Sequence, residues 1–380
     1  MGEKMKIGII TWFKFLNYGT ILQAVSLANY VTSLGHEVYL LDYPISGGRD
    51  GIFNLRDLKK RTVKFFSDHL EEKVYRNSIE KKKQRYHNFY ESRCNIAGGL
   101  KTKKEFIDYC NNLDLIICGS DQIWNPNWYS DFYFANFDEI HTPKISYGSS
   151  IGVESIPDML CGTYEDSIRK FSRVAVREKS LQRELKDKFN INAIHVIDPV
   201  CLLEEDQWKS IIKKNSFSFK KRYVVCYFLS DNKNYWAASR KFAQKNNLAL
   251  QIIPMTIHSK WMRGNKKMDI GPMEFLSIIS NAEYILTDSF HATMFSIIFK
   301  KQFYVFERFE PSKRDSQNSR ITDLLIELNL YDRLLKYNSR DVSNLKNIDF
   351  EKVNAYLEQL TNESKKYLKV EIMRIQDEKI

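Results

Sequence analysis

The sequence predicts an α/β protein made of two consecutive halves, and three observations lead to this prediction. The chain has 380 residues, more than one hydrophobic core usually supports, so two domains are expected. Short apolar runs alternate with segments of helical periodicity, which is typical of parallel strands joined by crossover helices. A basic stretch over 204–222, predicted to be a helical connection, interrupts this alternation, which then starts again. Two such halves imply a ligand site in the cleft between them.

The first half opens with a βαβ unit of parallel type. Residues 6–11 predict a buried strand, 20–34 a helix that ends at a glycine, and 37–42 a second strand. Asn17 and Gly19 lie in the turn before the helix, where a glycine lets a ligand approach the backbone and free N–H groups face outward. On spacing alone, a plain tight connection explains them equally well.

A further buried strand over 113–118 runs directly into the sequence GSDQIWNP. This places Ser120, Asp121 and Gln122 at the carboxyl end of the strand, where open α/β sheets bind ligands. Asp121 at this position either caps the next segment or serves as a general base or hydroxyl anchor. After a strand over 144–149, the sequence SRVAVREKS places Arg177 just past another apolar strand. Its guanidinium either forms a surface ion pair with its glutamate neighbour or binds a carboxylate or phosphate.

The second half follows a strand over 195–203 that contains a proline break, and its central feature is the sequence YILTDSFHATMFSIIF at 284–299. An apolar strand there leads into Thr287, Asp288 and Ser289, whose oxygen-bearing side chains are typical of a helix start. His291 falls in the first turn of the following apolar helix, where unpaired N–H groups favour an anion. A lone histidine in such a helix is commonly structural, but this position favours a functional role.

The end of the chain supplies candidate cations and a long helix. A strand over 303–306 precedes a polar segment over 307–319, predicted to be mobile, with Arg308, Lys313 and Arg314. Arg320, which precedes the amphipathic sequence ITDLLIEL, is the cation expected to face the cleft. Residues 350–373 predict a charged helix on the outside of the protein.

Composition narrows the class of protein. Six cysteines without a CxxC pair favour structural thiols over zinc or redox sites, and no metal is expected.

The net charge of +11 favours polyanionic partners, acidic lipid headgroups or phosphorylated substrates. The segment 56–104 interleaves basic and aromatic residues, which is typical of a solvated helix face or of a surface for anionic lipid; no nucleic-acid-binding motif accompanies it. The start lacks a signal-peptide pattern, so a cytoplasmic location is expected.

Seven motifs in order resemble the polysaccharide pyruvyl transferase family, from Ile7 to about Leu330. They are NYGTILQA, GSDQIWNP, VRE, DPVCLL, GPMEFL, TDSFHATMFSIIF and NSRITDLL. The resemblance implies two Rossmann-like domains facing across a cleft in a GT-B-like arrangement: an acceptor-side domain over 1–205 with the basic insertion at 56–104, a donor-side domain over 206–345, and a C-terminal helix over 346–380. It also implies phosphoenolpyruvate as co-substrate, no other cofactor, and formation of a pyruvate ketal on a hexose hydroxyl pair of a capsule or exopolysaccharide precursor.

The resemblance assigns roles to particular residues. The histidine of the family's arginine-x-histidine motif falls on His291, and Ser289 stands where many members have arginine. Arg177 or Arg320 would then have to supply the donor-binding cation. The resulting expectations are catalytic residues His291 and Asp121; donor-binding residues Arg177, Arg320, Ser289, Thr287 and Asp288; and acceptor-binding residues Asn17, Gly19, Ser120 and Gln122.

Two other functions fit the same sequence features. A GT-B-like glycosyltransferase that uses a nucleotide sugar would need the same cleft and helix terminus. A protein that binds sugars or lipid headgroups would have the same fold but would catalyse no reaction. The basic segment 56–104 motivates the expectation of a lipid diphosphate carrier for the acceptor and of a peripheral position at the inner face of an anionic membrane.

Overall fold

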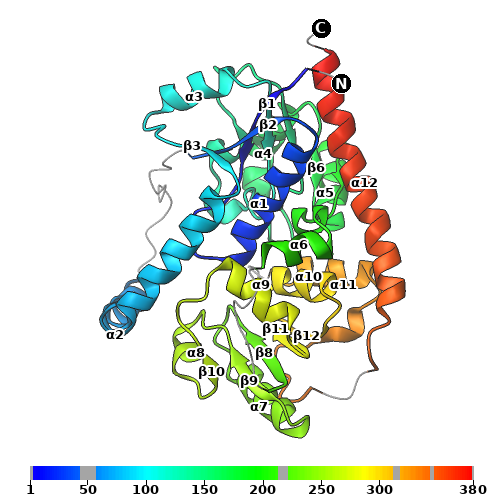
Figure 1. The fold of residues 1–380 in the computed structure, drawn as a ribbon. Coiled ribbons are helices and arrows are strands. Elements are labelled where there is room, and N and C mark those ends of the chain that lie inside the picture. Colours follow the sequence, from blue (N-terminus) through cyan, green and yellow to red (C-terminus); the bar gives the residue numbers. More distant parts are fainter. Residues whose placement is uncertain (1–2, 43–56, 213–220, 311–316, 343–345, 379–380) are drawn as a thin grey trace.

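Two α/β domains make up the computed structural model, and a long C-terminal helix joins them (Figure 1). The structure describes the whole chain except residues 1–2, 43–56, 213–220, 311–316, 343–345 and 379–380, and it describes the backbone but not the side chains of 57–73. The predicted cations Lys313 and Arg314 therefore lie outside the described residues.

The N-terminal domain contains a parallel sheet of strand order β3-β2-β1-β4-β5. Its strands are β1 (Lys6–Ile10), β2 (Glu37–Leu41), β3 (Asn95–Ala97), β4 (Leu115–Cys118) and β5 (Lys144–Ser146), and the short pair β6 (Ala175–Val176) and β7 (Ile194–His195) lies beyond β5. Its helices are α1 (Tyr18–Ser33), α2 (Asp57–Glu91), α3 (Lys103–Asn111), α4 (Cys161–Arg169) and α5 (Lys179–Phe189). The strands are almost wholly apolar because helices cover both faces of such a sheet.

The C-terminal domain contains a second parallel sheet, of order β10-β9-β8-β11-β12-β13. Its strands are β8 (Tyr223–Tyr227), β9 (Ala249–Ile252), β10 (Asn265–Lys266), β11 (Tyr284–Thr287), β12 (Gln302–Phe306) and β13 (Leu334–Leu335). Its helices are α6 (Glu205–Ile211), which precedes the sheet, α7 (Lys233–Lys245), α8 (Ile257–Trp261), α9 (Pro272–Ser280), α10 (Phe290–Ile298) and α11 (Ser319–Glu327).

The final helix, α12 (Phe350–Asp377), returns from the C-terminal domain to the N-terminal one (Figure 1). Its Tyr367 hydroxyl donates to the carbonyl oxygen of Ser146 at 2.9 Å, and Glu371 pairs with Arg173 at 3.3 Å. Both contacts join the last helix to the far edge of the first sheet, and α12 also packs against α10 of the C-terminal domain, so it links the two domains.

Helices α1, α9 and α10 meet at the domain boundary, where one hydrophobic core runs through both domains. The ring of Tyr18 stacks on Phe275 with centroids 4.5 Å apart, and its hydroxyl donates to the carbonyl oxygen of Ile270 at 3.0 Å. This packing sets the first turn of α1 against α9, which in turn packs against α10. The helices that border the cleft between the domains are thus held together by tight packing.

Two sequence predictions about connections need correction. The strand predicted over 195–203 is only the pair Ile194–His195, followed by a 3-10 turn at Pro199–Leu202, because proline cannot extend the strand pairing and the Asp198 side chain caps the turn by accepting from Val200 N at 3.1 Å. The helix predicted over 204–222 ends at Ile211, and the basic part after residue 212 lies largely outside the described residues.

Candidate active site

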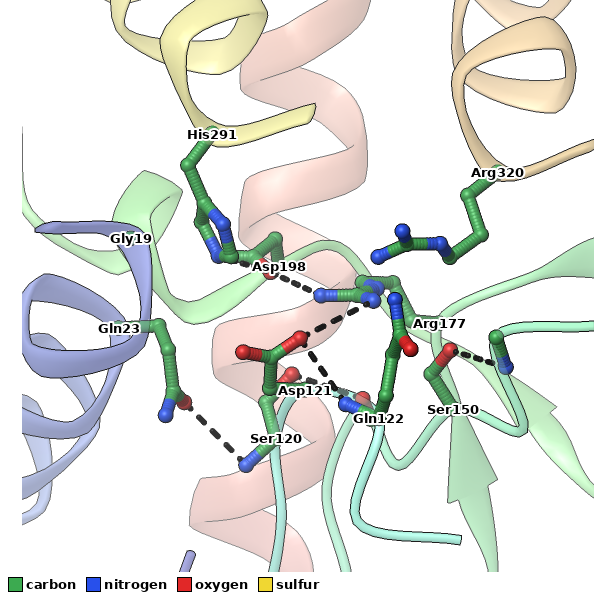
Figure 2. A network of polar contacts seen from close by, with 12 residues as sticks. Gly19, Gln23, Ser120, Asp121, Gln122, Ser150, Arg177, Asp198, His291 and Arg320 are labelled. Carbon is green, nitrogen blue, oxygen red and sulfur yellow. Dashed lines mark hydrogen bonds and ion pairs between the residues drawn. The ribbon is translucent and has the colours of Figure 1, made fainter. Parts of the chain in front are cut away.

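A cavity of about 980 Å³ lies between the domains, where β1, β4 and β11 end. Its N-terminal side carries Trp12, Asn17, Thr20, Asp121 and Gln122, and its C-terminal side carries Asp288, Ser289, His291, Arg308 and Arg320. Figure 2 shows side chains from α10, from α11 and from the loop after β4 converging on one place. The carboxyl ends of parallel strands in both sheets therefore face one another, as the sequence predicts for a ligand cleft.

His291 lies in the first turn of α10, at the wall of this cavity. Ser289 is the N-cap residue, and its hydroxyl accepts from the backbone N–H of Ala292 at 3.4 Å. His291 is only 7% exposed, and its Nε2 lies 3.5 Å from Oδ2 of Asp198. The opposite side of the ring packs against Gly19, where an added Cβ would lie 2.1 Å from Nδ1. Glycine is therefore required at position 19 by the neighbouring imidazole and not by the backbone conformation of a turn.

Gly19→Ala is expected to displace the His291 ring and reduce turnover strongly while leaving the fold intact. The reason is that a real Cβ cannot lie 2.1 Å from Nδ1, so the imidazole must leave its place beside Asp198. Alanine itself suits a helix start better than glycine, so no loss from helix propensity is expected. Turnover and thermal melting measured side by side would check this. Gly162→Ala, where nothing lies within 4 Å of the added carbon, is the matched control; equal turnover in both variants would contradict the expectation.

Asp198 is a site residue that the sequence reasoning missed. It is buried at 1% exposure and accepts from Arg177 Nη1 at 2.7 Å while facing His291. Burial opposes ionisation, but the neighbouring His291 and Arg177 outweigh it and hold the pKa of Asp198 well below its usual range. The buried carboxylate is therefore ionised and orients the imidazole. The available signal was a carboxylate just after an apolar run, in the sequence HVIDP.

Arg177 lies behind this pair and contacts three carboxylates. Its guanidinium is 2.7 Å from Asp198, 3.1 Å from Glu178 and 3.7 Å from Asp121, and it stands 4.5 Å above the ring of Phe290. Burial opposes its charge, yet Glu178, Asp198 and Asp121 raise the pKa of Arg177 above its ordinary value. Because Arg177 does not line the main cavity, its charge serves to hold Asp198 and Asp121 in place.

Asp121 reaches the cavity from the N-terminal domain. Its backbone φ of 72° lies in the left-handed region, which is uncommon for aspartate and is fixed here by the turn after β4. Oδ2 accepts from the Thr20 hydroxyl at 3.1 Å, and Oδ1 accepts from the Gln122 N–H at 2.9 Å. Both oxygens are held, so the carboxylate has one orientation toward the cavity.

Two arginines line the cavity without a carboxylate partner in the part of the chain that the structure describes. Arg320 is buried, donates to the side-chain oxygen of Gln317 at 3.2 Å and lies 2.5 and 2.6 Å from the Gln122 side-chain oxygen, when that amide is oriented to face it. Burial, and then the charge of Arg177, lower the pKa of Arg320 to about 10, so it remains a cation at neutral pH. Arg308 lies on the same side of the cavity. Neither guanidinium group is in ion-pair contact with a carboxylate of the described residues, so both can bind an anionic ligand.

The other residues predicted for the site take supporting positions. Asn17 caps α1 by accepting from Gly19 N at 3.0 Å and also lines the cavity. Thr287 donates to the carbonyl oxygen of Tyr227 at 2.6 Å, and Ser120 donates to that of Gly148 at 2.7 Å; neither lines the cavity. Asp288 lines it, but its carboxylate accepts from Leu229 N at 2.7 Å and from Ser230 N at 3.0 Å, and burial raises its pKa.

A family model named polysaccharide pyruvyl transferase matches residues 17–308, which is most of the chain. The chain belongs to the polysaccharide pyruvyl transferase family. It is therefore a transferase of polysaccharide biosynthesis, as the motifs predict. The match includes Asn17, Asp121, Asp198, His291 and Arg308, but it begins after Trp12 and ends before Arg320. The comparison with curated proteins found no significant sequence match.

Solved structures confirm the predicted fold class of this transferase. The glycosyltransferase SnogD from Streptomyces nogalater aligns over 98% of this chain and all of its own, with a TM-score of 0.51 at 11% identity. UGT89C1 from Arabidopsis thaliana aligns over 97% of this chain and 99% of its own, with a TM-score of 0.52 at 12% identity. At such identities the likeness concerns the fold alone, which is GT-B-like with two Rossmann-like domains.

The described residues show neither of two features, a membrane-spanning helix and a cluster of metal ligands. No helix among them combines the length and apolar character needed to cross a bilayer. Within the same residues, no group of three or more histidine, cysteine, aspartate or glutamate side chains is arranged to hold a metal ion.

Proposed function

We propose that this family member transfers the pyruvyl group of phosphoenolpyruvate to a pair of hydroxyls on a hexose and closes a pyruvate ketal with release of phosphate. The observation that carries the proposal is that Arg308 and Arg320, neither in ion-pair contact with a carboxylate of the described residues, line one wall of the cavity together with His291, whose Nε2 lies 3.5 Å from the buried Asp198. A small ligand with a carboxylate and a phosphate requires this combination of concentrated positive charge and a proton donor. No further cofactor is part of the proposal.

The donor lies on the C-terminal side in this proposal. Arg320 and Arg308 bind its anionic groups, and the free N–H groups at the start of α10, next to Ser289, favour phosphate. Arg177, which the resemblance assigns to the donor, is a positioning residue in this proposal because its guanidinium is surrounded by carboxylates.

The chemistry conserves atoms and charge. His291 donates a proton to the methylene carbon of phosphoenolpyruvate, and an acceptor hydroxyl forms a bond to the adjacent carbon. The C–O bond to phosphate then breaks, and the second hydroxyl bonds to the same carbon. Of the two hydroxyl protons, one restores His291 after the methyl group has formed, and the other leaves with phosphate. Asp121, facing the cavity with a fixed carboxylate, takes the proton of the attacking hydroxyl and passes it to the departing phosphate, so that it ends as a carboxylate; the proton of the second hydroxyl restores His291.

Arg320→Met is expected to weaken phosphoenolpyruvate binding by about 10–100-fold, because a hydrogen bond to a charged group contributes roughly 1.5–3 kcal/mol. Methionine fills similar space without charge, so the fold should persist. Isothermal titration with phosphoenolpyruvate measures the effect. Arg222→Met, which removes an exposed arginine paired with Glu283 away from the cavity, is the control. Donor affinity unchanged in Arg320→Met would remove this residue from the donor site.

The proposal is tested against its main alternative by ligand-dependent melting. A ligand that binds the native state raises apparent stability by mass action, so phosphoenolpyruvate should raise the melting temperature and UDP- or GDP-sugars should not. The opposite pattern would support a nucleotide-sugar glycosyltransferase. Phosphate release that requires both phosphoenolpyruvate and a sugar acceptor would exclude a protein that only binds sugars or lipid headgroups.

We further propose that the acceptor is carried on a lipid diphosphate and that the protein lies in the cytoplasm against an anionic membrane, with helix α2 facing the lipid. Lys81 and Lys83 are exposed on α2, whereas Lys82 packs over the ring of Tyr18 at 4.9 Å and is not free to reach a membrane. The lipid-facing charges in this proposal are therefore Lys81 and Lys83.

Replacing both Lys81 and Lys83 with glutamine is expected to weaken binding to phosphatidylserine vesicles by roughly tenfold or more, since each lysine near such a surface adds favourable electrostatic energy. Vesicle co-sedimentation measures it. The same change at Lys366 and Lys369, exposed on α12, is the control. Equal binding of both double variants would count against this orientation.

A further inference from the structure

The N-terminal side of the cavity is lined by seven aromatic side chains, here called the aromatic wall. They are Trp12, Phe15, Trp128, Tyr129, Phe132, Tyr133 and Phe137. The opposite side carries the arginines and His291. None of the seven takes part in the chemistry proposed above, and the cavity, at about 980 Å³, is at the upper end of small-molecule sites. It therefore has room for a second ligand beside a donor as small as phosphoenolpyruvate.

Trp128 is held firmly and yet is open to the cavity. It follows Asp121 and Gln122 in the loop after β4, and its indole N–H donates to the carbonyl oxygen of Gln122 at 3.2 Å. Its ring lies 5.9 Å from the ring of Trp12. Despite these contacts it is 41% exposed. A large ring fixed at one edge and exposed elsewhere is a preformed surface for a flat ligand face, and one short loop sets its distance from Asp121.

The chemistry of the wall favours a sugar over a lipid chain. The aliphatic residues of the cavity, Leu229 and Ile321, belong to the C-terminal side. The wall instead places polar groups between its rings: the Tyr129 hydroxyl donates to Asp131 Oδ1 at 2.9 Å, and both Ser130 and Asp131 line the cavity. A pyranose matches this pattern, because its C–H face packs on the electron-rich face of an aromatic ring while its hydroxyls need acceptors and donors at the ring edge.

We infer that Trp128, supported by Trp12, forms the subsite for the acceptor, and that this acceptor presents the apolar face of a hexopyranose to the indole. The inference deepens the proposed function and rests on it, because the bound sugar is an acceptor only if the protein transfers the pyruvyl group. Trp128 is a specificity-determining residue in this account. By stacking the sugar, it directs one edge of the ring, with its hydroxyls, toward Asp121 and the donor across the cavity.

The test measures sugar binding in the absence of phosphoenolpyruvate. NMR of the full chain monitors the indole N–H signals as each sugar is added. The probes are methyl glycosides of glucose, galactose and mannose, N-acetylglucosamine, N-acetylmannosamine, and a short-chain polyprenyl phosphate. The Trp128 signal is assigned from its loss in Trp128→Phe. At least one sugar is expected to shift that signal, and Trp128→Ala is expected to weaken its binding about tenfold, with Trp128→Phe nearer to the original protein.

Trp261→Ala removes a tryptophan that is 54% exposed on α8, outside the cavity lining, and is the matched control. The inference is overturned if the Trp128 signal responds to no sugar, if it responds only to the polyprenyl phosphate, or if Trp128→Ala and Trp261→Ala bind sugar equally. Because no donor is present, the result is independent of pyruvyl transfer. Phosphoenolpyruvate-dependent melting without a Trp128 effect would refute the subsite alone, and sugar binding through Trp128 without any response to phosphoenolpyruvate would refute the proposed reaction alone.

Discussion

His291→Asn is expected to lower kcat by about 10²–10⁴-fold, the usual cost of removing a positioned acid or base. The imidazole lies between Gly19 and Asp198 at the cavity wall, and it is the histidine that the described residues place there. Asparagine retains a polar side chain at the same point of α10 but cannot transfer the proton. The measurement is phosphate release at saturating phosphoenolpyruvate and acceptor.

His141→Asn, at an exposed histidine outside the cavity lining, is the control for this variant. Both proteins should melt within a few degrees of the original, since His141 is exposed and asparagine keeps a polar side chain beside Asp198 at the buried position of His291. A folded His291→Asn protein with nearly full turnover would show that the proton comes from another group, and Asp121 would be the next candidate.

Asp198→Asn is expected to reduce both turnover and stability. The loss of a carboxylate that orients an imidazole costs up to about 10⁴ in rate in catalytic triads, and Asp198 is the carboxylate that faces His291, with Oδ2 3.5 Å from Nε2. The substitution also removes one negative partner from the buried Arg177, and breaking such a pair typically destabilises by about 3–5 kcal/mol. Arg177 retains Glu178 and Asp121, so the lower end of that range is expected. Chemical denaturation and phosphate release measure the two effects.

The loss of unfolding free energy expected for Asp198→Asn depends on pH in a defined direction. The folded protein holds the pKa of Asp198 below its usual range, so the carboxylate stabilises the fold above its unfolded pKa of about 3.9 and loses this contribution as the pH falls. The difference in unfolding free energy between the original protein and Asp198→Asn should therefore be full near pH 7 and shrink below about pH 4. A difference that is constant over this range would mean that Asp198 is not stabilised as an ion.

Much of the fold could be predicted from the sequence because it depends on local patterns. The strand at Tyr284–Thr287, the N-cap at Ser289 and the helix after it follow from apolar periodicity and capping chemistry. The GT-B-like arrangement also follows from two runs of α/β alternation. Where Pro199 breaks an apolar run, the pattern suggested a longer strand than the chain forms, since periodicity does not report strand pairing.

The site was harder to predict because its residues acquire their roles through contacts distant in sequence. Asp198 meets His291 from 93 positions away along the chain, and no spacing rule signals such a pair. Arg177 has the sequence context of an anion ligand, but the structure surrounds it with carboxylates. Gly19 has the context of a ligand-binding turn, yet the neighbour that requires a glycine is the His291 ring.

The aromatic wall shows the same limit for Trp128. In the sequence it follows the end of β4 by ten residues and has no periodic partner, and only the folded loop brings it next to Trp12. Aromatic residues scattered along a chain usually belong to the core, so their exposure to a cavity is information that only the structure supplies.

Mass spectrometry of an acceptor incubated with the protein and phosphoenolpyruvate tests the central claim most directly. The expected product is the acceptor sugar with a mass gain equal to pyruvic acid minus water, formed together with an equal amount of phosphate and absent with His291→Asn. A mass gain of one sugar residue from a UDP- or GDP-sugar, with none from phosphoenolpyruvate, would contradict it.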